Sequence, residues 1–350
     1  MTYRLPSVTI DAGVLASPSP NCTMEDAYQY VDTLLDWSRL LDEPWIAIYM
    51  SEQASESLFA DSLYPLREHL SELFNKHGIV EFDVNTVARI VDQLLAITPS
   101  FETYYRVNDV LADAIKTDPD VIRLTTHDAL KSDLARCITL IAVLRKHCDQ
   151  PLGGHSLILR KAPRQVVRVK ARIHDIEHTR DDIPILPCPP DFFEGEVLVC
   201  DDFRGLITCL DECAILVGAS DNLGIELAIR IALFKKMIAQ GDAPDWNDLI
   251  APRIGAEFRA LCQRCCGDQG TSLPPKILRS IVETIQGQNL QDVHALRQGP
   301  GGNDPQRMRG SDKAQRRDID REFHLHYWEC ADGKVELASV GYHNDFSIPG

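Results

Sequence analysis

The segment FHLHYWECADGKVELASVGYH, which runs from Phe323 to His343, carries the clearest structural pattern of the chain. Polar and apolar side chains alternate at its start, and successive residues of a strand point to opposite faces, so His324 and His326 share one face. Asp332-Gly333 is a tight-turn dipeptide, and the residues from Lys334 to Tyr342 are rich in valine, leucine and alanine. The segment is therefore predicted to form a β-hairpin.

Three histidines collect on this hairpin, namely His324, His326 and His343, and Arg316, Arg317 and Arg321 precede it. Histidine can accept or donate a proton near neutral pH, so such a cluster indicates acid–base chemistry. The alternative is a solvated polar face on which local hydrogen bonds satisfy the histidines.

The residues from Pro274 to Gly350 resemble RelE/ParE-type toxins. The resemblance depends on a helix near Lys276, the Leu296-Arg297-x-Gly299 segment, the strand that begins at Phe323, and Val340-Gly341-x-His343 at the last strand. It implies RNA cleavage without a metal or other cofactor. One group would deprotonate the ribose 2′-hydroxyl, and another would protonate the leaving oxygen. The resemblance gives proton transfer to His324, His326 and His343, and contacts with phosphate to Arg309, Arg316, Arg317 and Arg321. The terminal tyrosine of the family has no counterpart here.

A short strand over Val8-Thr9-Ile10 ends at Asp11, in an Ile-Asp-x-Gly-Val-Leu context that resembles the opening of PIN-type nucleases. That resemblance implies a site for Mg²⁺ or Mn²⁺, ions that prefer carboxylate oxygens. It assigns Asp11, Glu56 and Asp133 as metal ligands. The expected acid after a later strand is absent, since Arg160-Lys161 stands there. The alternative is that Asp11 caps the helix after the strand.

Basic residues also gather on a strand predicted over residues 165–173, where Arg168, Lys170 and Arg172 share one face. We expect them to contact nucleic acid. The net charge of −16 argues against a general nucleic-acid coat protein, because an acidic surface repels phosphate.

The alternation of predicted strands and helices indicates an α/β fold, α+β overall. Strands are predicted at residues 8–10, 45–50, 79–82, 155–159 and 165–173, and helices from residue 23, from residue 65, and at 85–97, 101–116 and 127–147. We predict a PIN-like α/β domain over residues 1–180, a proline-rich linker and helical region over 181–273, and a RelE-like domain over 274–350. That last domain would be a small sheet with a packed helix.

Eleven cysteines occur at no regular spacing, and the N-terminus lacks the layout of a signal peptide. Reduced thiols in a cytoplasmic protein are expected. A structural zinc site at Cys262-x-x-Cys265-Cys266, completed by Cys209 and Cys213, is the alternative. No apolar run reaches the ~18 residues of a membrane span, so no membrane partner is predicted.

Together these patterns predict a nuclease-type effector of a prokaryotic toxin or phage-defence system, which cleaves RNA or another single-stranded nucleic acid. A protein partner or a homo-oligomer is also expected. The rival hypothesis is a non-catalytic scaffold that binds partners within a larger assembly.

Overall fold

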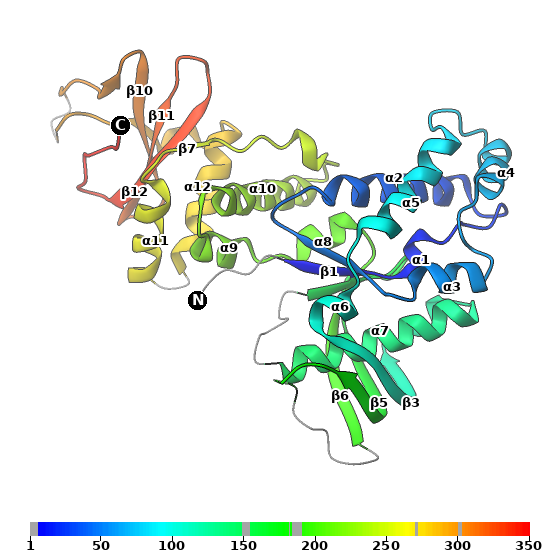
Figure 1. Ribbon diagram of the computed structural model, residues 1–350. Helices are drawn as coiled ribbons and strands as arrows, with labels where there is room; N and C mark the ends of the chain where they lie inside the picture. Colours follow the sequence, from blue (N-terminus) through cyan, green and yellow to red (C-terminus); the bar gives the residue numbers. More distant parts are fainter. Residues whose placement is uncertain (1–5, 149–154, 182, 184–190, 270–271, 300–302) are drawn as a thin grey trace. The chain divides into compact units, whose positions relative to one another are not determined.

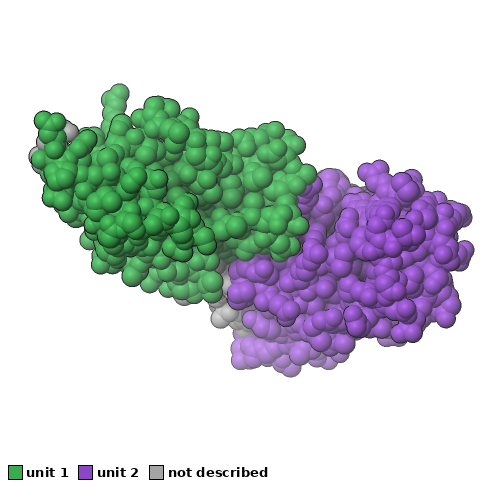
Figure 2. Space-filling view, turned by 90° about the horizontal axis from the view of Figure 1, so that it is seen from above, with its two compact units in different colours: residues 1–4, 210–350 green, residues 5–209 purple. Residues whose placement is uncertain are grey.

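The computed structural model describes residues 6–148, 155–181, 183, 191–269, 272–299 and 303–350. The chain divides into two compact units, an N-terminal unit of residues 5–209 and a C-terminal unit of residues 210–350 with residues 1–4 (Figure 2). This division differs from the predicted boundaries at residues 180 and 273. Strand β6 (Asp191–Cys200), which begins in the expected linker, pairs inside the first sheet. Helix α8 (Phe203–Cys209) also belongs to the N-terminal unit, whereas the later helices of the expected middle region belong to the C-terminal unit.

A six-stranded mixed sheet forms the centre of the N-terminal unit, with the strand order β2-β1-β4-β6-β5-β3 (Figure 1). Strands β1, β2, β4 and β6 are parallel, whereas β5 and β3 are antiparallel to their neighbours. The remaining strands are β1 (Ser7–Ile10), β2 (Ala47–Met50), β3 (Val107–Asp118), β4 (His155–Ile158) and β5 (Gln165–His178). The predicted strands near residues 8, 47, 155 and 165 are confirmed.

Helix α7 (Asp128–His147) packs on β3, β5 and β6, and its apolar side chains form most of one wall of the core. The other helices are α1 (Ala12–Leu15), α2 (Met24–Leu40), α3 (Ala54–Ala60), α4 (Arg67–His77), α5 (Val84–Ile97), α6 (Phe101–Tyr105) and α8 (Phe203–Cys209), with a 3₁₀ turn at Ile122–Leu124. Thr23 begins α2 with a capping box that Asp26 completes. The predicted start of this helix is confirmed.

Two predicted elements of this unit are wrong. The helix expected over residues 101–116 ends at Tyr105, because Arg106 adopts a left-handed conformation (φ 56°), and the chain continues as β3. Strand β3 is long because it pairs with β5 along its length, a partner distant in the sequence. The strand expected over residues 79–82 does not form. Gly78 ends α4 in the left-handed region, and Val80 is exposed with no neighbouring strand.

The C-terminal unit combines helices with a second sheet, ordered β7-β12-β11-β10-β8, in which β9 also pairs with β10. Its strands are β7 (Arg253–Ile254), β8 (Val293–Ala295), β9 (Met308–Arg309), β10 (Asp312–Asp318), β11 (Phe323–Glu329) and β12 (Val335–Tyr342). Its helices are α9 (Glu212–Gly218), α10 (Asn222–Ala239), α11 (Phe258–Gln269) and α12 (Leu273–Ile285), with 3₁₀ turns at Trp246–Asp248 and Leu290–Asp292. Helix α11 packs on β12, and α12 contacts β10 and β11. The predicted sheet with a packed helix is confirmed.

The predicted hairpin is the pair β11–β12, and Gly333 (φ 78°) provides its turn. A bulge interrupts the pairing between His326 and Tyr327. Both faces of β11 are covered, since every residue from Phe323 to Trp328 is buried. The last residues of the chain form part of this cover, because Trp328 donates a hydrogen bond to the carbonyl of Pro349 (2.9 Å).

Candidate functional site

Three histidines surround one carboxylate in the C-terminal unit, and we call Asp318, His294, His324 and His343 the histidine cluster. Nε2 of His324 lies 3.0 Å from Oδ1 of Asp318, and Nε2 of His294 lies 3.7 Å from Oδ2 of the same residue. The ring of His343 packs on that of His324 with the centroids 4.5 Å apart. Asp318 therefore lies between the imidazoles of His294 and His324. The ring of His343 packs on His324.

Strand register brings these residues together. Asp318 is the last residue of β10 and pairs with His324 on β11. Arg316, two residues earlier, pairs with His294 on β8. Since side chains of residues i and i+2 share a face, His294 lies diagonally opposite Asp318. The backbone N–H of His343 donates to the carbonyl of Glu322 (2.8 Å), which holds the end of β12 beside the start of β11.

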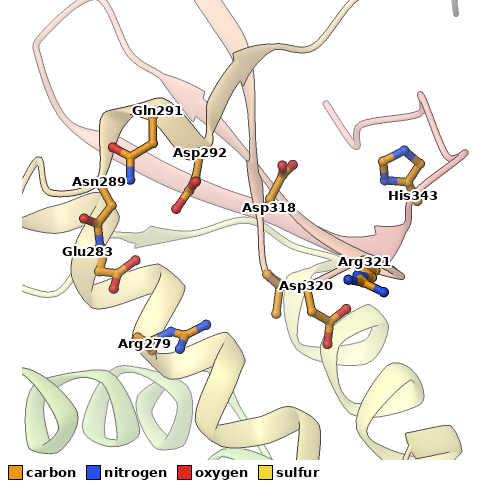
Figure 3. Close-up of a pocket in the computed structure, with 10 residues that line it drawn as sticks. Arg279, Glu283, Asn289, Gln291, Asp292, Asp318, Asp320, Arg321 and His343 are labelled. Atoms are coloured by element: carbon orange, nitrogen blue, oxygen red, sulfur yellow. The ribbon is translucent and has the colours of Figure 1, made fainter.

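An open cleft of about 700 Å³ lies beside this cluster. Figure 3 shows Asp318 and His343 at the sheet, Arg321 and Asp320 near the turn that follows β10, and Arg279 on α12. The other residues of the wall are Glu283, Asn289, Gln291, Asp292 and Ile319. His343 and His294 are exposed, and Asp318 is partly exposed. The exposed members of the cluster can therefore meet a ligand.

Burial controls the protonation of the inner histidines. It lowers the pKa of His324 to about 4, an effect that the Asp318 carboxylate opposes and the positive charge of Arg316 reinforces. Burial likewise lowers the pKa of His326 to about 4. The rings of His324 and His326 are therefore both neutral at pH 7. Neither ring nitrogen of His324 makes a hydrogen bond within the described part of the chain.

The structure brings two of the three predicted catalytic histidines, His324 and His343, to the cleft, but His324 lies behind His343 rather than in the wall. His326 is fully buried, its ring lies 6.2 Å from that of His324, and Nδ1 is 3.2 Å from the hydroxyl of Ser339. The solvated face considered as an alternative is therefore wrong for β11, a central strand that is covered on both faces, although His326 does have the local hydrogen-bond partner that this alternative expected.

The four arginines predicted to contact phosphate have different environments. Arg309 forms ion pairs with Asp312 (3.1 Å) and Glu336 (2.8 Å), and Arg317 is buried beside Glu283 (3.3 Å). These two arginines hold the unit together instead of facing a ligand. Arg321 is exposed in the wall of the cleft, and Arg316 is half-buried next to the histidine cluster.

The basic row predicted on β5 is exposed, but acids neutralise much of its charge. Glu194 lies 3.4 Å from Arg168 and 3.6 Å from Lys170, and Asp113 lies 3.9 Å from Arg172. The guanidinium of Arg172 also lies over the ring of Phe192. Exposed pairs of this kind exchange readily with solvent, so they weaken an attraction for phosphate without abolishing it.

The three acids predicted as metal ligands do not gather. Asp11 and Asp133 are both buried, and the charge of Asp133, after burial, raises the pKa of Asp11 to about 7. Oδ2 of Asp11 accepts the backbone N–H of Gly13 (2.8 Å), as the N-cap alternative predicted. Glu56 is exposed on α3 and makes no contact with them.

Arg136 forms an ion pair with Asp133, one of the three acids predicted to bind a metal ion. Its guanidinium donates to Oδ1 of Asp133 (3.1 Å), to the hydroxyl of Ser51 (2.7 Å) and to the carboxylate of Glu102. We call Asp11, Ser51, Glu102, Asp133 and Arg136 the acid–arginine cluster. Among the described residues, Oδ2 of Asp133 is buried without a hydrogen bond, a feature that would suit a cation. No three metal-ligating side chains meet in the described parts of either unit.

A crevice of about 430 Å³ opens beside Asp11 at the carboxyl ends of β1 and β4. The connections from these strands leave in opposite directions, and ligands often bind at such a switch point. Arg160 and Lys161 lie in its wall, and both have partners. Arg160 donates to the carbonyl of Ala16 (3.1 Å), and Lys161 pairs with Asp26 (2.7 Å).

Of the cysteines in the zinc alternative, Cys209 contacts Cys200 (Sγ–Sγ 3.2 Å). Burial, and then neighbouring charges that include Cys266, raise the pKa of Cys213, so Cys213 lies near α11. Cys262, Cys265 and Cys266 are buried in α11.

The site residues predicted from the sequence did not include Asp318 and His294. The arginines before Asp318 could have marked Asp318 as a candidate site residue. Nothing in the sequence near His294 indicates that β8 pairs with β10.

No protein-family model, no curated protein and no solved structure matches this chain. Across the ranges described above, no helix has the length and apolarity that crossing a membrane requires. Any function therefore has to be argued from the two clusters themselves.

Proposed function

We propose that the C-terminal unit cleaves RNA at the histidine cluster by general acid–base chemistry. The observation that carries the proposal is the exposed ring of His343, which packs on His324 beside Asp318 in the wall of an open cleft. A carboxylate next to imidazoles orients them and stabilises their protonated forms, which suits proton transfer.

In this mechanism His343 removes the proton from a ribose 2′-hydroxyl. The 2′-oxygen attacks the adjacent phosphorus, the bond from phosphorus to the 5′-oxygen breaks, and a 2′,3′-cyclic phosphate forms. His294 donates a proton to the leaving 5′-oxygen. Asp318 lies next to His294 and next to His324, on which His343 packs, so one carboxylate influences both steps. His324 is buried and neutral, and it acts as a positioning residue.

Arg321 and Arg279 in the cleft wall, with Arg316 behind the cluster, are the candidates for contacts with phosphate. The setting that we propose, following the RelE/ParE resemblance, is a prokaryotic toxin or phage-defence effector. Expression of the intact chain in bacteria should then arrest growth, and His343→Ala should relieve the arrest.

The direct test uses the purified chain and a labelled RNA oligonucleotide, together with a matched oligonucleotide that carries 2′-deoxyribose at every position. We expect cleavage of the RNA, a cyclic phosphate at the new 3′ end, and no cleavage of the deoxy strand. Cleavage of both strands at similar rates, or of neither, contradicts the proposal, because the mechanism requires the 2′-hydroxyl.

A second candidate function is the non-catalytic binding of a protein partner. The observation that favours it is the charge of the cleft, whose wall contains Glu283, Asp292, Asp318 and Asp320 but only two arginines. Carboxylates repel phosphate and attract basic side chains. A lysine- and arginine-rich peptide that binds more tightly than RNA, with no cleavage of RNA, would favour this function.

A further inference from the structure

Two cysteines meet at the end of the N-terminal unit. Cys200 is the last residue of β6, and Cys209 is the last residue of α8. Their sulfur atoms are 3.2 Å apart, whereas a disulfide requires about 2.05 Å. A shift of about one ångström would therefore bring them to bonding distance.

The connection between the two cysteines is short and well anchored. The carbonyl of Cys200 accepts a hydrogen bond from the backbone N–H of Leu159 (2.8 Å), which fixes the end of β6 against β4. Asp202 accepts the N–H of Gly205 (2.7 Å) at the start of α8, and Leu206 is buried. The proximity of the two thiols is thus maintained by backbone pairing and packing on both sides.

The two thiols differ in their access to solvent. Cys200 is fully buried, and Cys209 is partly exposed. The hydrogen bond with Cys209, and then burial, raise the pKa of Cys200, so this residue keeps its proton. An oxidant from solvent therefore meets Cys209 first, with the thiol of Cys200 beside it.

We propose that Cys200 and Cys209 form an oxidative cross-linking site that reacts with a peroxide. The Cys209 thiolate attacks one peroxide oxygen, the O–O bond breaks, and a sulfenic acid and hydroxide result. The sulfur of Cys200 then attacks the sulfur of Cys209, the S–O bond breaks, and water leaves with the Cys200 proton. The two thiols lose two electrons in total, and the peroxide is reduced to two molecules of water.

Tryptic mass spectrometry tests this directly, because Arg204 lies between the two cysteines. The intact chain is treated with hydrogen peroxide, unreacted thiols are blocked with N-ethylmaleimide, and the protein is digested without a reductant. We expect the peptide that ends at Arg204 to remain joined to the one that begins at Gly205, and dithiothreitol to separate them.

Variants identify the bonded residues. Cys209→Ser should abolish the joined peptide, and so should Cys200→Ser if that buried substitution folds. Cys213→Ser is the matched control, since Cys213 lies in the same tryptic peptide as Cys209, and it should leave the cross-link unchanged. Peptides that stay separate after peroxide treatment overturn the proposal, and so does a link that persists in Cys209→Ser.

A second measurement addresses the consequence for stability. A disulfide that closes this short loop restricts the unfolded chain, so peroxide should raise the melting temperature of the wild-type protein. The rise should be absent in Cys209→Ser and present in Cys213→Ser. An equal rise in both variants contradicts a specific cross-link.

Discussion

The acid–arginine cluster of the N-terminal unit and the histidine cluster of the C-terminal unit are both groups of charged and polar side chains, but the first is formed largely by helices and the second by strands, and their charges are balanced differently. In the first, Arg136 donates to Ser51, Asp133 and Glu102, so the protein supplies its own counter-charge. In the second, Asp318 contacts imidazoles, and His343 remains exposed in a cleft. A cluster that is neutralised from within contributes to folding, whereas one that is left open is available to a ligand.

The largest effect that we expect is on catalysis by the histidine cluster. His343→Ala should lower the rate of RNA cleavage by roughly 10²–10⁴, the usual contribution of a positioned proton-transfer group. Single-turnover assays with excess enzyme would measure it. His174→Ala is the matched control, because His174 also lies beside an aspartate, with Nε2 3.1 Å from Oδ2 of Asp113 in the other unit. Equal losses in both variants would remove the distinction between the clusters.

A substitution in the acid–arginine cluster should instead lower the stability of the folded protein. Arg136→Met leaves the buried carboxylates of Asp133 and Glu102 without their cation, which should cost about 3–5 kcal/mol of unfolding free energy. Urea denaturation would measure the loss. Arg123→Met is the control, since Arg123 forms an exposed pair with Asp120 and should change stability by less than about 0.5 kcal/mol. Similar values for the two variants would mean that the buried network is not a stability element.

Asp11 should make stability depend on pH. Its pKa is about 7 in the folded protein and 3.8 in the reference state, so the folded state binds more protons between these values, and stability falls as pH rises through this window. Asp11→Asn cannot ionise, and it can still cap α1. The variant should gain stability over the wild type between pH 5 and pH 8, by on the order of 2 kcal/mol. A difference that does not change with pH would contradict the raised pKa.

His326 should make stability depend on pH in the opposite direction. Its pKa falls from 6.5 to about 4 on folding, so the unfolded state binds more protons in this window, and stability is lost as pH falls from 6.5 towards 4. His326→Asn should flatten that slope by on the order of 1 kcal/mol, even if its stability at pH 7 is lower. Denaturation curves at pH 7 and pH 5 test this, and a wild-type slope in the variant would exclude His326 as its source.

The smallest expected effect concerns metal. Because the Arg136 guanidinium already contacts the carboxylates of Asp133 and Glu102, millimolar Mn²⁺ should leave the melting temperature within about 1 °C, and EDTA should not change RNA cleavage. A marked rise in melting temperature with Mn²⁺ that Asp11→Asn removes would restore a metal site in the N-terminal unit.

Local patterns predicted many of the elements correctly. The alternation from Phe323 onward, with the Asp332-Gly333 turn, predicted the β11–β12 hairpin, and Thr23 marked the start of a helix. These signals depend on neighbours within a few residues, so the sequence contains them directly. The same reasoning failed over residues 107–116, where pairing with β5 made a strand of a segment that was predicted to be helical.

The sequence alone determined the type and position of these locally encoded elements and the proximity of His324 and His343, but it left open whether Asp11 caps a helix or binds a metal ion. The tertiary structure decided which side chains of the two clusters are charged, which are buried, and which are accessible to a ligand. Arg136 reaches Glu102 only because α7 packs beside α3 and β3, and His294 reaches Asp318 only because β8 pairs with β10. Long-range pairing sets the burial and the counter-charge of each side chain, and these set its protonation and its access to a ligand.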